Sequence, residues 1–463
     1  MGIFGTLYIG YSGLFTDSHA MNISADNITN LNTTGFKAGR YEFGDVIRNA
    51  VGEVFTRGAG YGATPKATRW LFSQGGIQTT DVPTDLAISG RGFFVVSDSK
   101  GNIFFTRDGQ FMINEADEKN FALQNSLGMY LLGADPNATT AGIADLKTHL
   151  IPKVMPAKAT SKVSVQLLLN ANRPTNTETL LSKYDWTADP TKPLQDGKYD
   201  WVFDWDIYDP LGQKITLKAY FDRGDNPNTY EVLLALADPT KDTRGDGKFK
   251  GAFLYGTLTF GGNGEVVSAD FSQISDPSGT LSPLDLTTLG QPKFTLTVDG
   301  RTQDITLDLG FKVNPDGSIT RLNYPTRLSA NPFAQLYFSQ DGYEEGVFDR
   351  IEVITEEGSI KAWYTNNKDL PVAKLFLADF NGYEESLEKV GNNLFRAKAN
   401  ATPFIFAPGA GERARILSGA LETSNTDLAQ EMVHLILLQR AFQSNSRVIT
   451  TADQMLEDFL RQR

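Results

Sequence analysis

The chain has 463 residues, more than one hydrophobic core usually organises, so we expect about three domains. Its net charge of −12 argues against nucleic-acid binding, and the lack of cysteine excludes disulfides, thiolate nucleophiles and cysteine-ligated metals. No run of about eighteen apolar residues occurs, and the apolar N-terminus lacks a basic start and a clear cleavage site, so we expect neither membrane insertion nor a cleaved signal peptide.

The first segment is predicted to be a helix that ends near Thr34 and Gly35, because glycine readily adopts the left-handed conformation found at helix ends. Its apolar side chains recur at every seventh position, which places them on one stripe and favours coiled-coil packing. These residues are Leu7, Leu14, Met21 and Ile28. Segment 23–39 is rich in Asn and Asp, which weaken helix interiors, so we expect its amides to bridge to other copies of the chain.

The middle of the chain is predicted to form β-structure. Segment 199–221 alternates apolar and polar residues, with Trp201, Trp205 and Ile207 on one face. Segment 87–113 has the pattern of short strands separated by glycine-bearing turns. Asp-Gly and Asn-Gly pairs, which suit two-residue hairpin turns, recur throughout, and many short strands with such turns favour sandwiches or barrels.

The C-terminal segment is predicted to be a second long helix. Its apolar side chains also recur at every seventh position. These residues are Leu428, Leu435, Phe442, Ile449 and Leu456. Ser424 with Asp427 resembles a capping box, so we expect the helix to begin at Ser424.

Composition changes near 133–145 and 323–335 suggest a nested chain. We predict a multidomain α+β fold in which a terminal helical coiled coil accompanies β-rich, sandwich-like or barrel-like middle domains, with N- and C-terminal segments paired. The predicted domains are a helical domain from 1–70 and 402–463, a discontinuous β domain from 71–145 and 335–401, and an inserted β domain of one or two subdomains from 146–334.

A search for catalytic or ligand-binding motifs finds little. The three histidines, His19, His149 and His434, are far apart in sequence and form no ligand-spaced pair. Arg244-Gly245-Asp246 matches an adhesion tripeptide, but the simpler interpretation is a hairpin tip. We therefore expect no catalytic residue, cofactor or metal. The alternatives from other classes are a secreted β-rich adhesin or binding module, and an ordinary globular body capped by two helices.

Both ends of the chain resemble the bacterial flagellar rod and hook protein family. The N-terminal signature residues are Asp26, Asn27, Ile28, Thr29, Asn30, Asn32, Thr33, Gly35, Phe36 and Lys37, of which Asp26 and Thr29 depart from the commonest pattern. The matching C-terminal block includes Leu421-Glu422, Ser424-Asn425 and Gln439-Arg440. Between them, FFTRDGQF is shared by hook and rod members, and segments 206–221 and 339–395 resemble hook proteins in particular.

The resemblance implies a structural subunit of the flagellar hook, a curved tube that acts as a universal joint between rod and filament. It implies self-polymerisation, with the terminal helices lining the inner tube, the two-segment β domain in the middle shell and the insertion outside. It also implies export by the flagellar type III apparatus to an extracellular location in the hook and basal body. The implied partners are the hook cap protein, the distal rod protein and the hook–filament junction proteins. The alternative within the family is a distal rod or other axial protein.

On this interpretation the assembly interface consists of the two apolar stripes, whose residues recur at every seventh position, and of the amide side chains of the N-terminal signature. The expected residues are Leu7, Leu14, Met21, Asn27, Ile28, Asn30, Asn32, Phe36, Leu428, Leu435, Gln439, Phe442, Ile449 and Leu456. We expect hinges where glycine and proline accumulate, at Gly58, Gly60, Pro65, Pro408 and Gly409.

Overall fold

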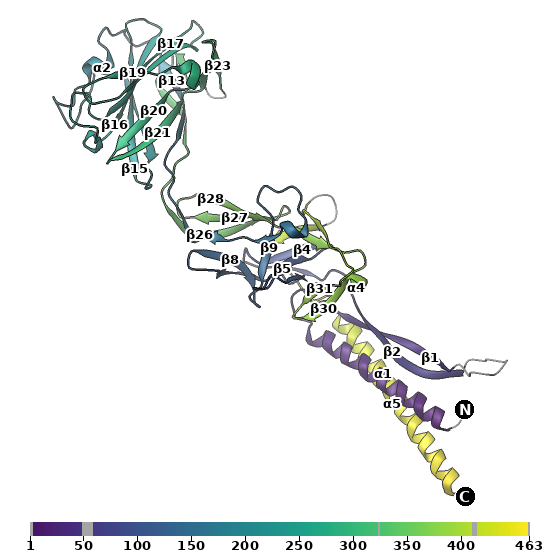
Figure 1. Cartoon of the computed structure of the whole chain (residues 1–463). Coiled ribbons are helices and arrows are strands. Elements are labelled where there is room, and N and C mark those ends of the chain that lie inside the picture. Colours follow the sequence, from purple (N-terminus) through teal and green to yellow (C-terminus); the bar gives the residue numbers. More distant parts are fainter. Residues whose placement is uncertain (1–2, 49–58, 323–324, 410–413, 462–463) are drawn as a thin grey trace. The chain divides into compact units, whose positions relative to one another are not determined.

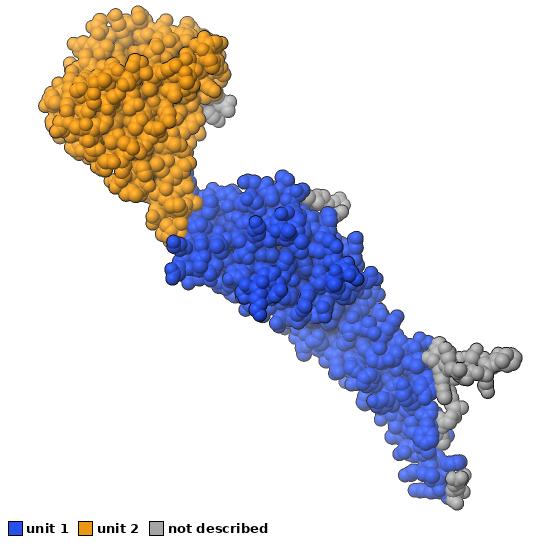
Figure 2. Space-filling view, viewed as in Figure 1, with its two compact units in different colours: residues 1–153, 348–364, 368–463 blue, residues 154–347, 365–367 orange. Residues whose placement is uncertain are grey.

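Figure 1 shows the computed structural model of the chain, which describes residues 3–48, 59–322, 325–409 and 414–461. The chain divides into two compact units (Figure 2). Unit 1 contains residues 1–153, 348–364 and 368–463, and unit 2 contains residues 154–347 and 365–367.

The elements of unit 1 come from both ends of the chain. They are α1 (Ile3–Thr29), β1 (Gly39–Arg48), β2 (Ala59–Trp70), β3 (Ile77–Thr79), β4 (Leu86–Gly90), β5 (Phe94–Ser97), β6 (Ile103–Thr106), β7 (Phe111–Glu115), β8 (Asn120–Asn125), β9 (Tyr130–Gly133), η1 (Ile143–Asp145), β10 (Lys147–Thr148), β11 (Ile151–Pro152), β27 (Ser359–Tyr364), β28 (Asp369–Lys374), β29 (Leu377–Asp379), α4 (Tyr383–Ser386), β30 (Leu387–Gly391), β31 (Leu394–Ala397), β32 (Phe404–Phe406), β33 (Ala414–Ser418), β34 (Ala420–Glu422) and α5 (Leu428–Arg461).

Unit 2 consists mainly of strands. Its elements are β12 (Val154–Met155), β13 (Lys162–Asn170), α2 (Leu180–Lys183), β14 (Trp201–Tyr208), β15 (Lys214–Arg223), β16 (Thr229–Leu236), η2 (Pro239–Lys241), β17 (Ala252–Phe260), β18 (Val266–Ile274), β19 (Leu281–Pro283), α3 (Leu286–Leu289), β20 (Lys293–Val298), β21 (Arg301–Asp308), β22 (Phe311–Val313), β23 (Ile319–Arg321), β24 (Arg327–Ser329) and β25 (Ala334–Gln340). The strand β26 (Gly346–Ile354) begins in unit 2 and ends in unit 1.

Segments from the two ends of the chain pair in unit 1, which confirms the predicted nesting. The strand β3 pairs with β34, β4 with β33, and β6 with β31, all antiparallel. A buried apolar cluster that includes Phe93, Phe105, Phe376 and Phe395 joins the strands from both ends. The β-rich fold with paired terminal helices is therefore as expected.

Unit 2 is a β-sandwich built on the predicted alternation. A six-stranded antiparallel meander, β14 to β19, packs against a five-stranded sheet in which β13 is central. Trp205 and Ile207 of β14 are fully buried, whereas Trp201 at the start of the strand is 43% exposed. Side chains from both sheets form one core, since Val163 and Val165 of β13 belong to the same cluster.

The limits of unit 2 differ from the predicted insertion, 146–334. The strands β10 and β11 pair with β9 and β8 in unit 1, and β25 pairs with β13 in unit 2. Hydrogen bonding to a neighbouring strand, and not the change in composition, decides which unit each segment joins. The further separation of unit 1 into a helical and a β domain stays a prediction.

The two long helices begin and end at other residues than predicted. The helix α5 is capped by Asp427, whose carboxylate accepts hydrogen bonds from the backbone N–H groups of Ala429 (2.8 Å) and Gln430 (3.2 Å). Ser424 instead accepts a hydrogen bond from the N–H of Thr426, one turn earlier. The helix α1 ends at Thr29, before the predicted stop, because the following polar residues close local turns through their side chains.

Two of the expected hinge residues lie inside a strand. The strands β1 and β2 form an antiparallel ribbon, in which Gly60 pairs with Ile47 and Pro65 with Phe43. The ribbon packs against α1, and the rings of Tyr8 and Tyr61 lie 4.6 Å apart. The structure thus places Gly60 and Pro65 in paired strand where we predicted a hinge, and Gly58 lies outside the described residues.

The other two expected hinge residues lie just after β32. Pro408 is buried, and the N–H of Gly409 donates a hydrogen bond to the carbonyl of Ala414 (2.9 Å). A Cβ placed at Gly358 would lie 3.0 Å from Cγ of Pro408, so the turn is in close contact with its neighbour. The hinge role of Pro408 and Gly409 stays a prediction.

Candidate assembly surface on the terminal helices

The helices α1 and α5 lie side by side and run antiparallel in unit 1 (Figure 1). The α1 side of their contact has positions at alternating spacings of three and four residues, as in a coiled coil. Gly10, Gly13, Asp17 and Asn27 contact α5, and the buried Ala20 and Ser24 fit the same spacing. All of them are small or polar, so the contact includes α1 positions that the predicted apolar stripe does not contain.

Two glycines allow the helices to approach closely. A Cβ at Gly10 would lie 2.8 Å from Cγ1 of Ile449, and a Cβ at Gly13 would lie 2.4 Å from Nδ2 of Asn445. A larger side chain on α1 at either position would force the facing side chain of α5, or α5 itself, to shift. Sequence reasoning missed both glycines because it followed apolar periodicity alone.

Polar pairs fix the register of the two helices. Asn445 donates a hydrogen bond to the carboxylate of Asp17 (2.9 Å), and Asn27 donates one to the carboxylate of Glu431 (2.8 Å). Burial raises the pKa of Asp17, and the hydrogen bond from Asn445 opposes this shift. A sliding movement of one helix past the other would break both pairs.

The side chain of Asn27 is buried and forms its hydrogen bonds within its own chain. It is 1% exposed, and its amide exchanges two hydrogen bonds of 2.8 Å with the backbone of Gly39. Phe36 is likewise buried, with 2% exposure. The structure therefore places these two predicted interface residues inside the subunit.

The remaining predicted interface residues are at least partly accessible. Leu7, Leu14, Met21, Ile28, Asn30, Leu435, Ile449 and Leu456 are half-buried, and Asn32, Leu428, Gln439 and Phe442 are exposed. Asn30 donates hydrogen bonds to Asp26 of its own helix. In this amide-rich segment, Asn27 and Asn30 thus form hydrogen bonds within their own chain.

Large apolar side chains are exposed on both helices. On α1 they are Phe4, Tyr11 and Phe15, and on α5 they are Leu428, Met432, Val433, Ile436, Leu437, Met455, Phe459 and Leu460. Phe4 is 77% exposed and Leu437 is 57% exposed. So many exposed large apolar side chains on one helix pair are typical of a protein–protein interface. We call this set of residues the outer helix surface.

A groove of about 320 Å³ interrupts the outer helix surface between α1 and α5. It is lined by Thr6, Ser444, Arg447, Val448, Thr451, Ala452 and Met455. Arg447 is the only charged residue among them, so the groove suits an apolar or aromatic side chain of a partner.

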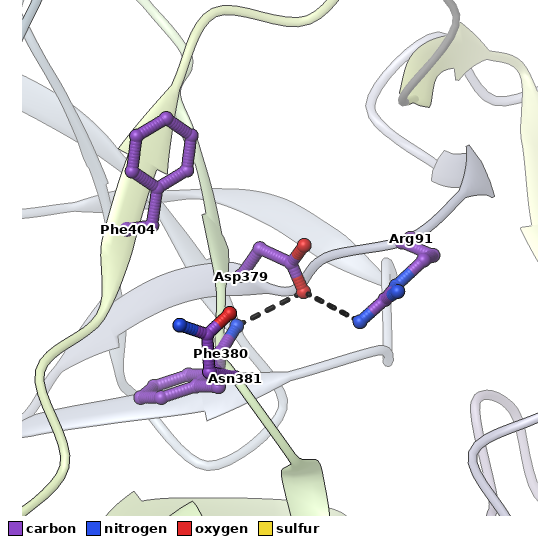
Figure 3. A pocket seen from close by; sticks show the side chains of 5 residues that line it. All are labelled: Arg91, Asp379, Phe380, Asn381 and Phe404. Carbon is purple, nitrogen blue, oxygen red and sulfur yellow. Dashed lines mark hydrogen bonds and ion pairs between the residues drawn. The ribbon is translucent and has the colours of Figure 1, made fainter.

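Two features could suggest another function, a surface pocket and an adhesion-like tripeptide, but their charged side chains are paired within the chain. Figure 3 shows a surface pocket of about 410 Å³, in which Asp379 accepts a hydrogen bond from the N–H of Phe380 (2.9 Å) and pairs with Arg91 (3.7 Å). The side chain of Arg244, in the adhesion-like tripeptide, is bonded to Asp242 and lies 3.8 Å from the ring centre of Phe253. It is therefore not presented to a receptor.

Within the described ranges, no cluster of three or more His, Cys, Asp or Glu side chains is arranged to hold a metal ion. None of the helices described here combines the length and hydropathy that a membrane crossing requires.

Four family models match successive parts of the chain. Residues 7–37 match the flagella basal body rod protein, 87–166 the flagellar hook protein FlgE/F/G D1 domain, 179–343 the flagellar basal body protein FlaE D2 domain, and 417–462 the flagellar basal body rod FlgEFG protein C-terminal region. The matched segments include α1, α5 and most of unit 2.

Relatives similar to this chain align over nearly its whole length. The flagellar hook protein FlgE of Treponema pallidum is 27% identical, with 98% of each chain covered. The flagellar hook protein FlgE of Salmonella typhimurium is 28% identical, again with 98% of each chain covered. The crystal structure of Helicobacter pylori flagellar hook protein FlgE2 covers 75% of this chain and 100% of its own, with 16% identity and a TM-score of 0.46.

Proposed function

Because the chain belongs to the flagellar hook protein family, we propose that it is a structural subunit of the bacterial flagellar hook, which polymerises with copies of itself into a tube. Proteins of this family are structural, which fits the expectation that the chain is not an enzyme. The large β-sandwich of unit 2 supports a hook subunit over a distal rod protein, since rod proteins tend to be shorter.

The observation that carries the proposal is the outer helix surface. Burying a Leu, Met or Phe side chain contributes about 1.5–3 kcal/mol, and this surface leaves eleven large apolar side chains accessible in the single chain. Copies arranged around a common axis would bury these side chains against one another, and a head-to-tail contact that does not close generates a helical assembly. Self-polymerisation thus accounts for a surface that would otherwise favour aggregation.

The proposal includes the finer role of a universal joint that transmits motor torque to the filament. It also includes export through the flagellar type III apparatus and contacts with the distal rod, hook cap and hook–filament junction proteins. The chain carries no cysteine, so it forms no disulfide during passage through an export channel, which is consistent with this route.

Deletion of the gene in its own bacterium tests the proposal. We expect purified basal bodies to keep a complete rod and to lack a hook in electron micrographs, and expression of the full chain from a plasmid should restore the hook. Cells that keep hooks after deletion would contradict the proposal, and a shortened rod would favour a distal rod protein instead.

A further inference from the structure

Three charged side chains from distant parts of the sequence meet in the interior of unit 1. The carboxylate of Glu422 lies 2.7 Å from Nζ of Lys37 and 3.0 Å from Nη1 of Arg107. Their exposed fractions are 0% for Glu422, 1% for Lys37 and 4% for Arg107. We call these three residues the Glu422 cluster.

The cluster is connected to the backbone of further segments. Oε1 of Glu422 also accepts a hydrogen bond from the N–H of Gly75 (2.9 Å), and Lys37 donates one to the carbonyl of Ser73 (2.8 Å). Arg107 donates one to the carbonyl of Gly90 (2.8 Å). Burial lowers the pKa of Lys37, and the attraction of Glu422 opposes this shift.

The cluster lies where the helix pair joins the strands. Lys37 follows α1 and precedes β1, and Glu422 is the last residue of β34, shortly before α5. Arg107 directly follows β6 in the β part of unit 1. Each of the three side chains therefore comes from a different one of the three chain segments that meet at this junction.

Further hydrogen bonds and close contacts join the same three segments. The N–H of Gly35 donates a hydrogen bond to the carbonyl of Glu422 (2.7 Å). Gly35 has a φ of +68°, and a Cβ there would lie 2.5 Å from the carbonyl carbon of Arg107. Asn425 accepts a hydrogen bond from the N–H of Ala38 (2.8 Å) and donates one to the carbonyl of Leu71 (2.7 Å).

We propose that Glu422 is a positioning residue that fixes the direction of the α1–α5 pair relative to the β strands of unit 1, so that this junction transmits torque as a stiff connection. The inference rests on the proposed function and deepens it, because it places stiffness at one defined point within the subunit. Charge-assisted hydrogen bonds in a buried site hold a narrow geometry, and the carboxylate of Glu422 accepts three of them, each from a separate segment of the chain. Removal of the carboxylate leaves two buried cations without a counter-charge, which the structure can relieve by opening the junction.

Distance measurements between two spin labels test this inference. The chain has no cysteine, so Gln454→Cys on α5 and Lys100→Cys in the β part of unit 1 can be labelled selectively. Doubly labelled chains are diluted into unlabelled chains, assembled into tubes and measured by pulsed electron paramagnetic resonance. In the Glu422→Gln background we expect the distance distribution to widen by about twofold or more.

Two further variants separate positioning from simple stabilisation. Glu422→Gln combined with Lys37→Met restores the net charge of the cluster and should narrow the distribution again. Arg415→Met, which removes an exposed ion pair with Glu356 in the turn between β26 and β27, should leave the width unchanged. If Glu422→Gln does not fold, Lys37→Met alone should give an intermediate width.

Normal tubes with an unchanged distance distribution in every variant would overturn the inference while leaving the hook proposal intact. The same holds if thermal unfolding of unit 1 shifts downward and the distribution does not widen, because Glu422 then only stabilises the fold. If the unsubstituted chain forms no tubes, the proposed function itself fails.

Discussion

Asn445 of α5 donates a hydrogen bond to Asp17 of α1, and the same side chain fills the space beside Gly13 that a Cβ would occupy. One amide thus fixes both the spacing and the register of the helix pair. Gly13→Ala should displace Asn445 and leave a buried carboxylate without its donor, at a cost of about 1.5–3 kcal/mol, which exceeds the gain of about 1 kcal/mol in helix propensity. Urea unfolding followed by circular dichroism measures the net loss.

A double-mutant cycle provides the control for Gly13→Ala. In an Asn445→Ala background the space beside Gly13 is empty and the hydrogen bond is already lost, so Gly13→Ala should be neutral or stabilising. Equal destabilisation in both backgrounds would show that Asn445 does not set the spacing.

The stability of the helix pair should depend on pH through Asp17. Burial raises its folded-state pKa above 3.8, so the folded state holds the proton more tightly than the unfolded state. The resulting stabilisation is complete below 3.8 and is lost as the pH rises through the folded-state pKa. Asp17→Asn should therefore match the parent near pH 3 and exceed it in stability near pH 7.

Urea unfolding at the two pH values checks this, with Asp453→Asn on the exposed face of α5 as the control. Asp453→Asn should change the free energy of unfolding by the same small amount at both pH values. A parent chain that is more stable than Asp17→Asn near pH 7 would contradict the assignment of burial as the dominant effect.

Gly35 should tolerate no side chain. Its positive φ and the backbone of Arg107 at 2.5 Å from a Cβ predict a loss of about 1–3 kcal/mol or more for Gly35→Ala. Gly60→Ala is a matched control, because no atom lies within 4 Å of a Cβ at Gly60. Chemical denaturation should show Gly60→Ala within about 1 kcal/mol of the parent.

The control also bears on the hinge prediction. Gly60 is paired in β2, so Gly60→Ala should leave tube curvature and swimming unchanged. Straight tubes from Gly60→Ala would instead support the hinge that the glycine content first suggested.

The sequence was a good guide to the helices and to the nested pairing, because seven-residue periodicity and strand alternation report directly on local structure. It missed part of the helix contact for a physical reason. The apolar stripe at Leu7 and Leu14 is the strongest pattern, and it does not mark Gly13 or Asp17, through which α1 also meets α5. Periodicity locates an apolar face but does not say whether the same chain or another copy covers it.

The junction could not be predicted from sequence for a different reason. Lys37, Arg107 and Glu422 each lie in a recognisable signature, but the signatures are far apart and nothing local pairs them. Only the antiparallel pairing of β3 with β34 brings Glu422 into the interior. The start of α5 could not be predicted exactly from local sequence either. Ser424 and Asp427 are both good N-cap residues, and in the structure Asp427 caps the helix.

The central claim is that the outer helix surface holds neighbouring subunits together, and electron microscopy of tubes grown from Leu437→Lys tests it most directly. Leu437 is 57% exposed, and Gln454→Lys adds the same charge at an exposed polar position of the same helix. We predict that Gln454→Lys forms normal tubes, whereas Leu437→Lys forms none although its unit 2 sandwich unfolds at the parent temperature. Leu437→Lys tubes of normal length and abundance would contradict the claim.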